Sequence, residues 1–129
     1  MKRMVVGFVF NASTTAVMLI RKVKPEWQCG LLNGIGGKIE QGESTCGAMR
    51  RECLEEAGID IDIWTWVHKL SADDWEVDFF ACCADLSMMR SMEVEQLEVI
   101  MLSDINPLRV DMINNLPWLI PMARWTLNT

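Results

Sequence analysis

The chain has 129 residues, of which 50% are hydrophobic and 23% charged, and its formal net charge is −6 at pH 7. This length predicts a single domain, residues 1–129, with a core of its own. The acidic balance argues against a general binder of nucleic-acid polymers or of membrane surfaces, because either would show a basic patch. The 5 cysteines have no C-x-x-C spacing and indicate free thiols in a reducing cytoplasm.

Two apolar stretches open the chain. Residues 4–10 and 16–21 are rich in β-branched side chains and predict two strands, joined by a polar turn at residues 11–14. Because both runs are almost continuously apolar, we expect the strands to be covered on both faces. The polar turn also interrupts the apolar stretch, which argues against a signal peptide or a membrane span. A loop with Pro25 follows, and then a short strand is expected at residues 37–39.

A helix is predicted over residues 44–57. This segment has no proline and consists mostly of good helix formers. Ser44 or Thr45 can cap its start, and Gly58 stands where a helix ends in the left-handed conformation.

Three glutamates gather on this helix. Glu52, Glu55 and Glu56 are three and four residues apart, so their carboxylates project to one neighbourhood and repel by roughly 0.2–0.5 kcal/mol per pair. A solvated surface is the simple alternative, but a divalent cation such as Mg²⁺ between the carboxylates gives the arrangement a purpose. Arg51 can pair with one glutamate and fix its rotamer. The preceding glycines let the backbone bend and offer a carbonyl, that of Gly37, as another ligand.

The second half of the chain predicts more strands and a closing helix. Residues 59–68 alternate in polarity and residues 75–86 return after a turn, which predicts a hairpin. A further strand is expected at residues 97–102. A helix over residues 116–125 closes the chain, and Pro121 is expected to bend or shorten it. The order of elements predicts an α/β protein with a mixed sheet flanked by helices.

The stretch G-K-I-E-Q-G-E-S-T-C-G-A-M-R-R-E-C-L-E-E-A-G-I resembles the signature of the Nudix (MutT-like) hydrolases. Every fixed position is filled, and a chance match is on the order of 10⁻⁹ per start. Those positions are Gly37, Glu43, Arg51, Glu52, Glu55, Glu56 and Gly58. Cys53 departs from the signature, which has a bulky aliphatic residue there; we expect looser packing and unchanged chemistry. The resemblance implies a Nudix-type α/β/α sandwich with a mixed central sheet.

The same resemblance implies a reaction, the hydrolysis of a nucleoside diphosphate linked to a further group X. It assigns Glu52, Glu55, Glu56 and the carbonyl of Gly37 to Mg²⁺, with Mn²⁺ as an alternative metal. It places Arg51 among the catalytic residues, and Glu52 or Glu55 could double as the general base. Metal ions and fixed cations suit this chemistry, because phosphoryl transfer depends on positioning and electrostatic stabilisation.

A glutamate outside the signature sometimes serves as the base in this family, on a loop after the helix. Glu95 stands at the corresponding place, just before the strand expected at residues 97–102, and Glu93 and Glu98 are its neighbours. A solvated loop acid is the alternative reading of Glu95. Lys38 is expected to touch phosphate, although it could simply be exposed. Glu43 is expected to act as a capping acid at the helix start.

The run L-N-G-I-G-G-K resembles the W-N-G-F-G-G-K run of the oxidised-purine nucleoside triphosphate pyrophosphatases, with leucine in place of tryptophan. The resemblance implies that Asn33 contacts the base and that Asn114 and Asn115, before Trp118, read the purine edge. Amides offer both a donor and an acceptor, and Trp27 or Trp118 could stack on the ring. The alternatives are a turn for the first asparagine, a helix cap for the later pair, and a core position for the tryptophan.

The leading prediction is a Mg²⁺-dependent (d)NTP pyrophosphohydrolase that releases NMP and pyrophosphate and so removes oxidised or non-standard nucleotides. One alternative is a Nudix hydrolase of an NDP-sugar, a dinucleoside polyphosphate or a dinucleotide, and another is a non-catalytic nucleotide-binding module. The intact glutamates argue against the last, because a pure binder gains nothing from an uncompensated acidic cluster. The expected partner is a small-molecule nucleotide, and the chain is expected to be a cytoplasmic monomer or homodimer.

Overall fold

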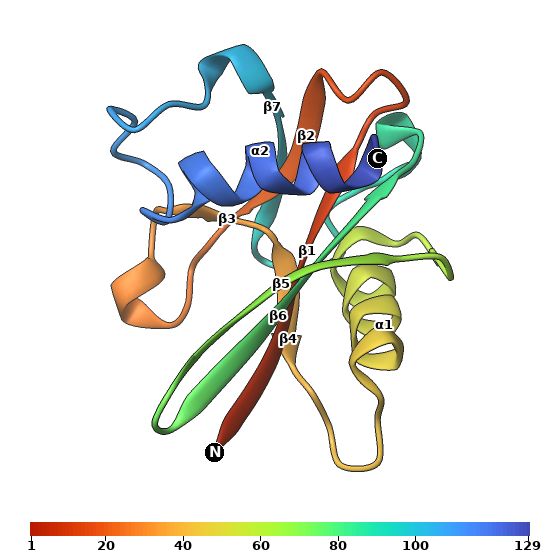
Figure 1. The fold of residues 1–129 in the computed structure, drawn as a ribbon, viewed down its shortest axis with the longest axis vertical. Coiled ribbons are helices and arrows are strands. Elements are labelled where there is room, and N and C mark those ends of the chain that lie inside the picture. Colours follow the sequence, from red (N-terminus) through yellow and green to blue (C-terminus); the bar gives the residue numbers. More distant parts are fainter.

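A computed structural model describes residues 1–129 and shows a seven-stranded mixed sheet with a helix on each face (Figure 1). The strands are β1 (Lys2–Phe10), β2 (Ala16–Arg21), β3 (Leu32–Asn33), β4 (Ile35–Lys38), β5 (Thr65–Ala72), β6 (Trp75–Cys83) and β7 (Gln96–Met101). The helices are α1 (Thr45–Ala57) and α2 (Leu116–Leu127), and three short 3-10 turns are η1 (Glu26–Gln28), η2 (Leu86–Met88) and η3 (Leu102–Asp104). The expected α/β sandwich with a mixed sheet is confirmed.

The sheet is organised around the parallel pair of β1 and β6. The two strands stay in register from Lys2 opposite Trp75 to Phe10 opposite Cys83. On its other edge β1 pairs first with β4 and then with β2, both antiparallel. β2 in turn pairs with β3 and β7, and β6 pairs with β5. β1 therefore lies at the centre of the sheet, which explains why Val5 and the residues from Gly7 to Phe10 are buried.

Side chains that alternate along the strands build two separate apolar clusters, one under each helix. In β1, Phe8 and Phe10 belong to one cluster, and Val5 and Val9 belong to the other. The α1-side cluster consists of Val5, Val9, Met18, Ile35, Ala48, Met49, Cys53, Ala57, Trp64, Phe80, Cys82 and Met89. The α2-side cluster consists of Phe8, Phe10, Val17, Leu19, Leu32, Val67, Phe79, Ala81, Ile100, Met112, Ile113, Leu116, Leu119, Ile120 and Ala123.

Both helices are found where the sequence predicts them. The side chain of Ser44 accepts a hydrogen bond from the amide of Gly47 at 3.0 Å, and Gly58 ends α1 with a φ of 70°. These two caps confirm the predicted bounds. α2 runs past Pro121 to Leu127, so the expectation that this proline would shorten the helix was wrong. Pro121 is the sixth of the twelve residues of α2, so its missing amide removes one interior hydrogen bond, and the helix still continues for six residues beyond it.

The strand predicted at residues 59–68 begins only at Thr65. The segment before it is irregular, and its partly buried isoleucines pack against the α1-side cluster instead of alternating across a sheet. Arg50 binds Asp60 through two hydrogen bonds of 2.6 and 2.9 Å, and the indole of Trp64 donates to the carbonyl of Ile61 at 2.8 Å. These contacts hold residues 59–64 against α1. The alternation of apolar residues in this segment therefore predicted a strand that does not form.

Strand ends elsewhere also differ from the predictions. β6 ends at Cys83 and is followed by η2, whereas a strand was expected to residue 86. The short strand expected at residues 37–39 is β4, which includes the glycines. All cysteine side chains are free, as predicted. Neither helix combines the length and the apolar character needed to cross a lipid bilayer.

Gly36 marks the closest approach between β4 and β1. A Cβ atom there would lie 1.9 Å from the carbonyl oxygen of Val5, and neither backbone can move without breaking the strand pairing. We expect Gly36→Ala to lower the free energy of unfolding by about 3 kcal/mol, measured by urea denaturation. Gly47→Ala is the control, because its Cβ would meet only the Ser44 hydroxyl, at 3.0 Å. Equal losses in both variants would contradict this explanation.

Candidate active site

The guanidinium group of Arg51 forms hydrogen bonds with most of the surrounding groups of the site. Its Nε and Nη2 donate to the two carboxylate oxygens of Glu43 at 2.7 and 2.9 Å. Its Nη1 donates to Glu52 at 2.9 Å and to Glu55 at 3.2 Å, and Nη2 also donates to the carbonyl of Lys38 at 2.9 Å. One side chain on α1 thereby holds the loop before the helix, two helix carboxylates and the end of β4 in fixed positions.

Glu43 does not act as the capping acid that the sequence suggested. Ser44 caps α1, while Glu43 accepts the bidentate pair from Arg51 and a further hydrogen bond from the amide of Glu40 at 2.8 Å. The hydrogen bonds from Arg51, and then that from the amide, lower the pKa of Glu43. The pairing leaves no local signal in the sequence, because Glu43 lies in the loop, eight positions before Arg51, and not on the helix itself.

Glu52 packs directly against the backbone of Gly37. A Cβ atom on Gly37 would lie 2.6 Å from Oε1 of Glu52, so only glycine leaves room for this carboxylate. Burial raises the pKa of Glu52, and the hydrogen bond from Arg51 partly offsets this rise. The structure thus brings together two of the predicted metal ligands, one on β4 and one on α1.

Glu56 is the buried acid of the site. The residue is 7% exposed and its Oε2 has no hydrogen-bond partner. Burial first, and then the charge of Glu52, raises the pKa of Glu56 to about 8. A buried carboxylate oxygen without a partner is costly, and a divalent cation would supply the missing interaction. The donor set therefore fits a hard cation such as Mg²⁺.

The remaining carboxylates do not enclose an ion by themselves. Glu55 lies at the rim, with a side chain 52% exposed, and no three His, Cys, Asp or Glu side chains converge closely enough to hold a metal. Mg²⁺ usually keeps several waters and completes its coordination with substrate phosphates. An incomplete protein shell is consistent with that behaviour.

A loop after η2 docks on the C-terminal end of α1 and brings two more acids to the site. The amides of Arg90 and Met92 donate to the carbonyls of Ala57 and Glu56 at 3.1 and 3.2 Å. The negative charges of Glu93 and Glu95, on this loop, contribute to the raised pKa of Glu56. Glu98 points elsewhere: it lies on β7 and binds Arg21 at 2.7 and 2.8 Å.

Glu93 and Glu95 differ sharply in their surroundings. Glu95 accepts hydrogen bonds from the ammonium of Lys22 at 2.9 Å and from the amides of Val23 and Lys24 at 2.6 and 3.2 Å. Burial works against ionisation of Glu95, but these three donors together outweigh it and lower its pKa. The Glu93 side chain is exposed and forms no hydrogen bond or ion pair within the protein.

The residues predicted to read the base lie near one edge of the sheet. Asn33, on β3, donates through Nδ2 to Gln28 at 3.0 Å and accepts from the amide of Gly34 at 2.8 Å. The neighbouring Leu32 exchanges hydrogen bonds of 2.8 and 3.0 Å with the backbone of Asp111 and Ile113. This pairing fastens the segment before α2 to β3.

The asparagine pair before α2 does not cap the helix with its side chains. Asn115 is the N-cap residue, but its side chain makes no capping hydrogen bond and its Oδ1 is buried without a partner. Asn114 is exposed, and Trp118 is 46% exposed with an edge contact to His68 at a centroid distance of 6.3 Å. The capping alternative is therefore confirmed for the position of Asn115 but not for a capping hydrogen bond from its side chain. Lys38 is exposed at the end of β4, and only its carbonyl is engaged.

Cys53 fills its place in the α1-side cluster completely. Its side chain is fully buried, and burial raises the pKa of the thiol to about 12. At neutral pH the thiol is uncharged and behaves as a small apolar side chain. This departure from the signature therefore adds no charge beside the glutamates of α1.

Comparison with known proteins agrees with this geometry. The family model described as the NUDIX domain matches residues 1–119. A structure from a study of MutT from Aliivibrio salmonicida and Vibrio cholerae has a TM-score of 0.79 and 25% identity, covering 96% of this chain and 98% of that one.

Two further solved structures share the fold at lower identity. The NUDIX domain of Shewanella oneidensis NrtR, complexed with ADP ribose, has a TM-score of 0.80 and 15% identity, covering 97% of this chain and 87% of that one. A MutT NUDIX hydrolase from Burkholderia pseudomallei has a TM-score of 0.78 and 18% identity, covering 94% and 96%. No curated protein matches the sequence.

The raised pKa of Glu56 predicts a pH-dependent stability of the metal-free protein. Between its ordinary value of 4.5 and about 8, the folded chain binds more protons than the unfolded chain, so the free energy of unfolding falls as the pH rises. In EDTA, the free energy of unfolding of Glu56→Gln should exceed that of the wild type by more than about 1 kcal/mol at pH 8. The two proteins should be equally stable near pH 4.5. Urea denaturation across this window measures the difference.

Glu26→Gln is the matched control for this measurement, because Glu26 is exposed and forms no side-chain hydrogen bond. The difference in the free energy of unfolding between Glu26→Gln and the wild type should not change over the same pH range. A flat difference for Glu56→Gln as well would contradict the burial of an uncompensated acid.

Proposed function

The chain belongs to the Nudix family of hydrolases, which act on phosphoanhydride bonds, and we propose that it is a Mg²⁺-dependent pyrophosphohydrolase of nucleoside triphosphates, releasing NMP and pyrophosphate. The observation that carries the proposal is the buried, unpartnered Oε2 of Glu56 beside the Arg51-bound Glu52. The negative charge of a buried carboxylate without a partner is unfavourable unless a bound cation neutralises it. We further propose that residues 1–129 act as one domain, in the cytoplasm.

Under this proposal Glu52, Glu55, Glu56 and the carbonyl of Gly37 hold the metal ion. When bound, Mg²⁺ would screen these carboxylates from the substrate phosphates and lower the pKa of the attacking water. Arg51 keeps the carboxylate of Glu52 in one orientation through its hydrogen bond of 2.9 Å.

The proton of the attacking water needs an acceptor, and the environments of the acids suggest a division of roles. Burial raises the pKa of Glu52, which suits a group that takes up a proton. The pKa of Glu95 is lowered, so this carboxylate stays ionised at neutral pH and suits the orientation of water more than proton uptake. Glu55 is the other candidate for the base. Lys38, exposed beside the carboxylates, is proposed to contact phosphate.

A purine base is proposed to bind at the edge formed by Asn33 and the segment before α2. The buried Oδ1 of Asn115 lacks a donor, and an N–H on the edge of a base would supply one. Trp118 is half exposed and offers part of its ring for stacking, and Asn114 is exposed next to it. The resemblance of the L-N-G-I-G-G-K run to that of nucleoside triphosphate pyrophosphatases supports a triphosphate as substrate, and the likeness to a MutT structure at 25% identity agrees with a MutT-like enzyme.

A second candidate is a nucleoside diphosphate sugar. It is favoured by one observation, the fold shared with a NUDIX domain that binds ADP ribose. A non-catalytic binding module is the third possibility, and it is disfavoured by the complete set of glutamates in the signature.

A substrate panel tests the function directly. Canonical and oxidised (d)NTPs and ADP-ribose are incubated with Mg²⁺ or EDTA, and products are identified by chromatography. We expect NMP and pyrophosphate from a triphosphate, no product in EDTA, and an at least hundredfold lower kcat/KM for Glu52→Gln and Glu56→Gln. Arg50→Gln is the control, because Arg50 pairs with Asp60 outside the site. A loss below tenfold in both glutamate variants would contradict the assignment.

The loop acids make a separate test with a matched pair. Glu95→Gln removes a carboxylate bound to Lys22 and two amides, whereas Glu93→Gln removes an exposed one two residues away. If Glu95 orients the water, its variant should lower kcat about a hundredfold with a small change in KM, and Glu93→Gln should change kcat less than threefold. The reverse order would assign the role to Glu93.

A further inference from the structure

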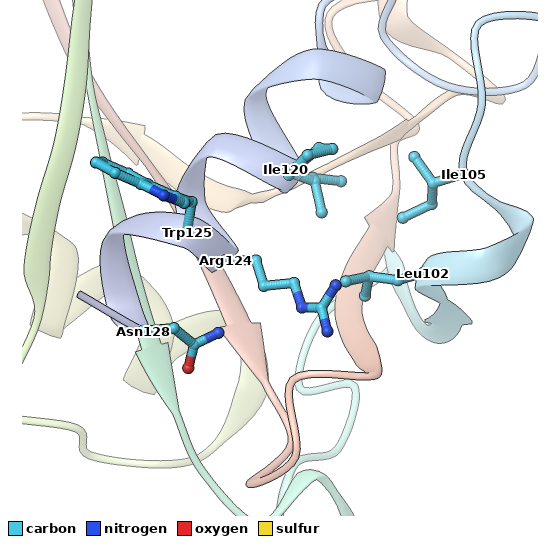
Figure 2. Close-up of a pocket in the computed structure, with 7 residues that line it drawn as sticks. Leu102, Ile105, Ile120, Arg124, Trp125 and Asn128 are labelled. Carbon is cyan, nitrogen blue, oxygen red and sulfur yellow. The ribbon is translucent and has the colours of Figure 1, made fainter.

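A surface hollow lies between the second half of α2 and η3, away from the carboxylates (Figure 2). Its volume is about 410 Å³, which is within the range of small-molecule sites. One part of its lining is apolar and consists of Leu102, Ile105, Ile120, Pro121 and Trp125. The other part is polar and consists of Arg124 and Asn128. No residue of α1 or of the acidic loop contributes to it.

A second hollow of about 320 Å³ adjoins the first and shares Leu102 and Arg124 with it. Its other lining residues are Thr14, Thr15, Met101 and Ser103, of which three carry hydroxyl groups. The first hollow is lined mostly by apolar side chains and the second is rich in hydroxyl groups. Arg124 lines both hollows and so lies between the two. Such a gradient suits a ligand with an apolar body and a polar head.

Arg124 is exposed, is oriented by a buried hydroxyl and forms no ion pair within the protein. Its Nε donates to Oγ1 of Thr14 at 3.3 Å, and Nδ2 of Asn128 donates to the same oxygen at 3.3 Å. Thr14 is 4% exposed, so this anchor lies inside the protein. The two Nη atoms of Arg124 have no hydrogen bond or ion pair. Figure 2 shows the side chain reaching from α2 toward Leu102.

This lack of a partner is unusual in an acidic chain. Every other arginine except Arg90 forms an ion pair, although acids outnumber bases by 18 to 12. A guanidinium group with two free Nη atoms matches a carboxylate, which accepts two parallel hydrogen bonds. The unpaired charge thus points to an anionic ligand from outside the chain.

We propose that this hollow binds a small amphipathic carboxylate, with its apolar body against Leu102 and Ile105 and its head group on Arg124 (Figure 2). A single negative charge fits better than a phosphate dianion for two reasons. Arg124 is the only cation in the lining, and it lies in the last turn of α2, where the helix carbonyls already favour a cation and oppose an anion. The site is separate from the proposed hydrolysis and does not depend on it.

Octanoate is the probe for this proposal, because it combines an eight-carbon apolar body with one carboxylate. Titration of the intact chain is followed by the backbone amide signals in ¹H–¹⁵N correlation spectra. We expect saturable shifts confined to residues 101–105, 120–128 and the turn at residues 13–15. Octanol, which lacks the charge, and acetate, which lacks the body, should each bind at least about tenfold more weakly.

Two variants separate a specific site from general adsorption. Arg124→Gln should weaken octanoate binding about tenfold or more, and Arg124→Lys should retain part of the affinity. Arg90→Gln removes the other unpaired arginine, which does not line the hollow, and should leave the affinity unchanged. Turnover by Arg124→Gln should match the wild type, which also shows that the variant is folded.

Three results would overturn the proposal. The first is the absence of saturable shifts with octanoate below its micelle-forming concentration. The second is a set of shifts centred outside the hollow. The third is an affinity of Arg124→Gln, or of octanol for the wild type, equal to that of octanoate for the wild type.

Discussion

The site depends on one planar cation surrounded by acids. Arg51 uses a bidentate pair on Glu43 and single bonds to Glu52, Glu55 and the carbonyl of Lys38, a pattern that only a rigid, multi-donor fork can make. Because Glu52 also presses against the backbone of β4, its carboxylate is fixed from two directions. The orientation of Glu52 therefore depends both on the register of β4 on β1 and on the position of α1. A shift in either would displace this carboxylate.

The same arrangement leaves the site short of positive charge. Glu56 is buried without a donor for one oxygen, and Lys22, whose positive charge lowers the pKa of Glu56, is already bound to Glu95. A domain selected only for stability would replace such a group with an apolar side chain of similar size. Under the proposed function, this acid lowers the stability of the metal-free domain and contributes affinity for a cation.

Local features could be predicted from the sequence, and long-range partners could not. Ser44 and Gly58 fix the bounds of α1 by capping rules that involve neighbouring residues only. The partner of Glu95 is 73 residues away, and the hydroxyl that orients Arg124 is 110 residues away, so neither leaves a local pattern. The false strand at residues 59–64 has the opposite cause. Its three isoleucines have the period of a strand, but Ile59 and Ile61 pack against the α1-side cluster and Ile63 is exposed.

The division of the core into two clusters has a consequence for how such a domain diverges. The sheet lies between α1 and α2 (Figure 1). It therefore separates the α1-side cluster, which supports the acids, from the α2-side cluster, which supports the segment before α2. Mutations that repack one cluster share few contacts with the other, so their effects are nearly additive across the sheet. A substitution in the α2-side cluster can therefore reshape the segment before α2 with little effect on the acids supported by the other cluster.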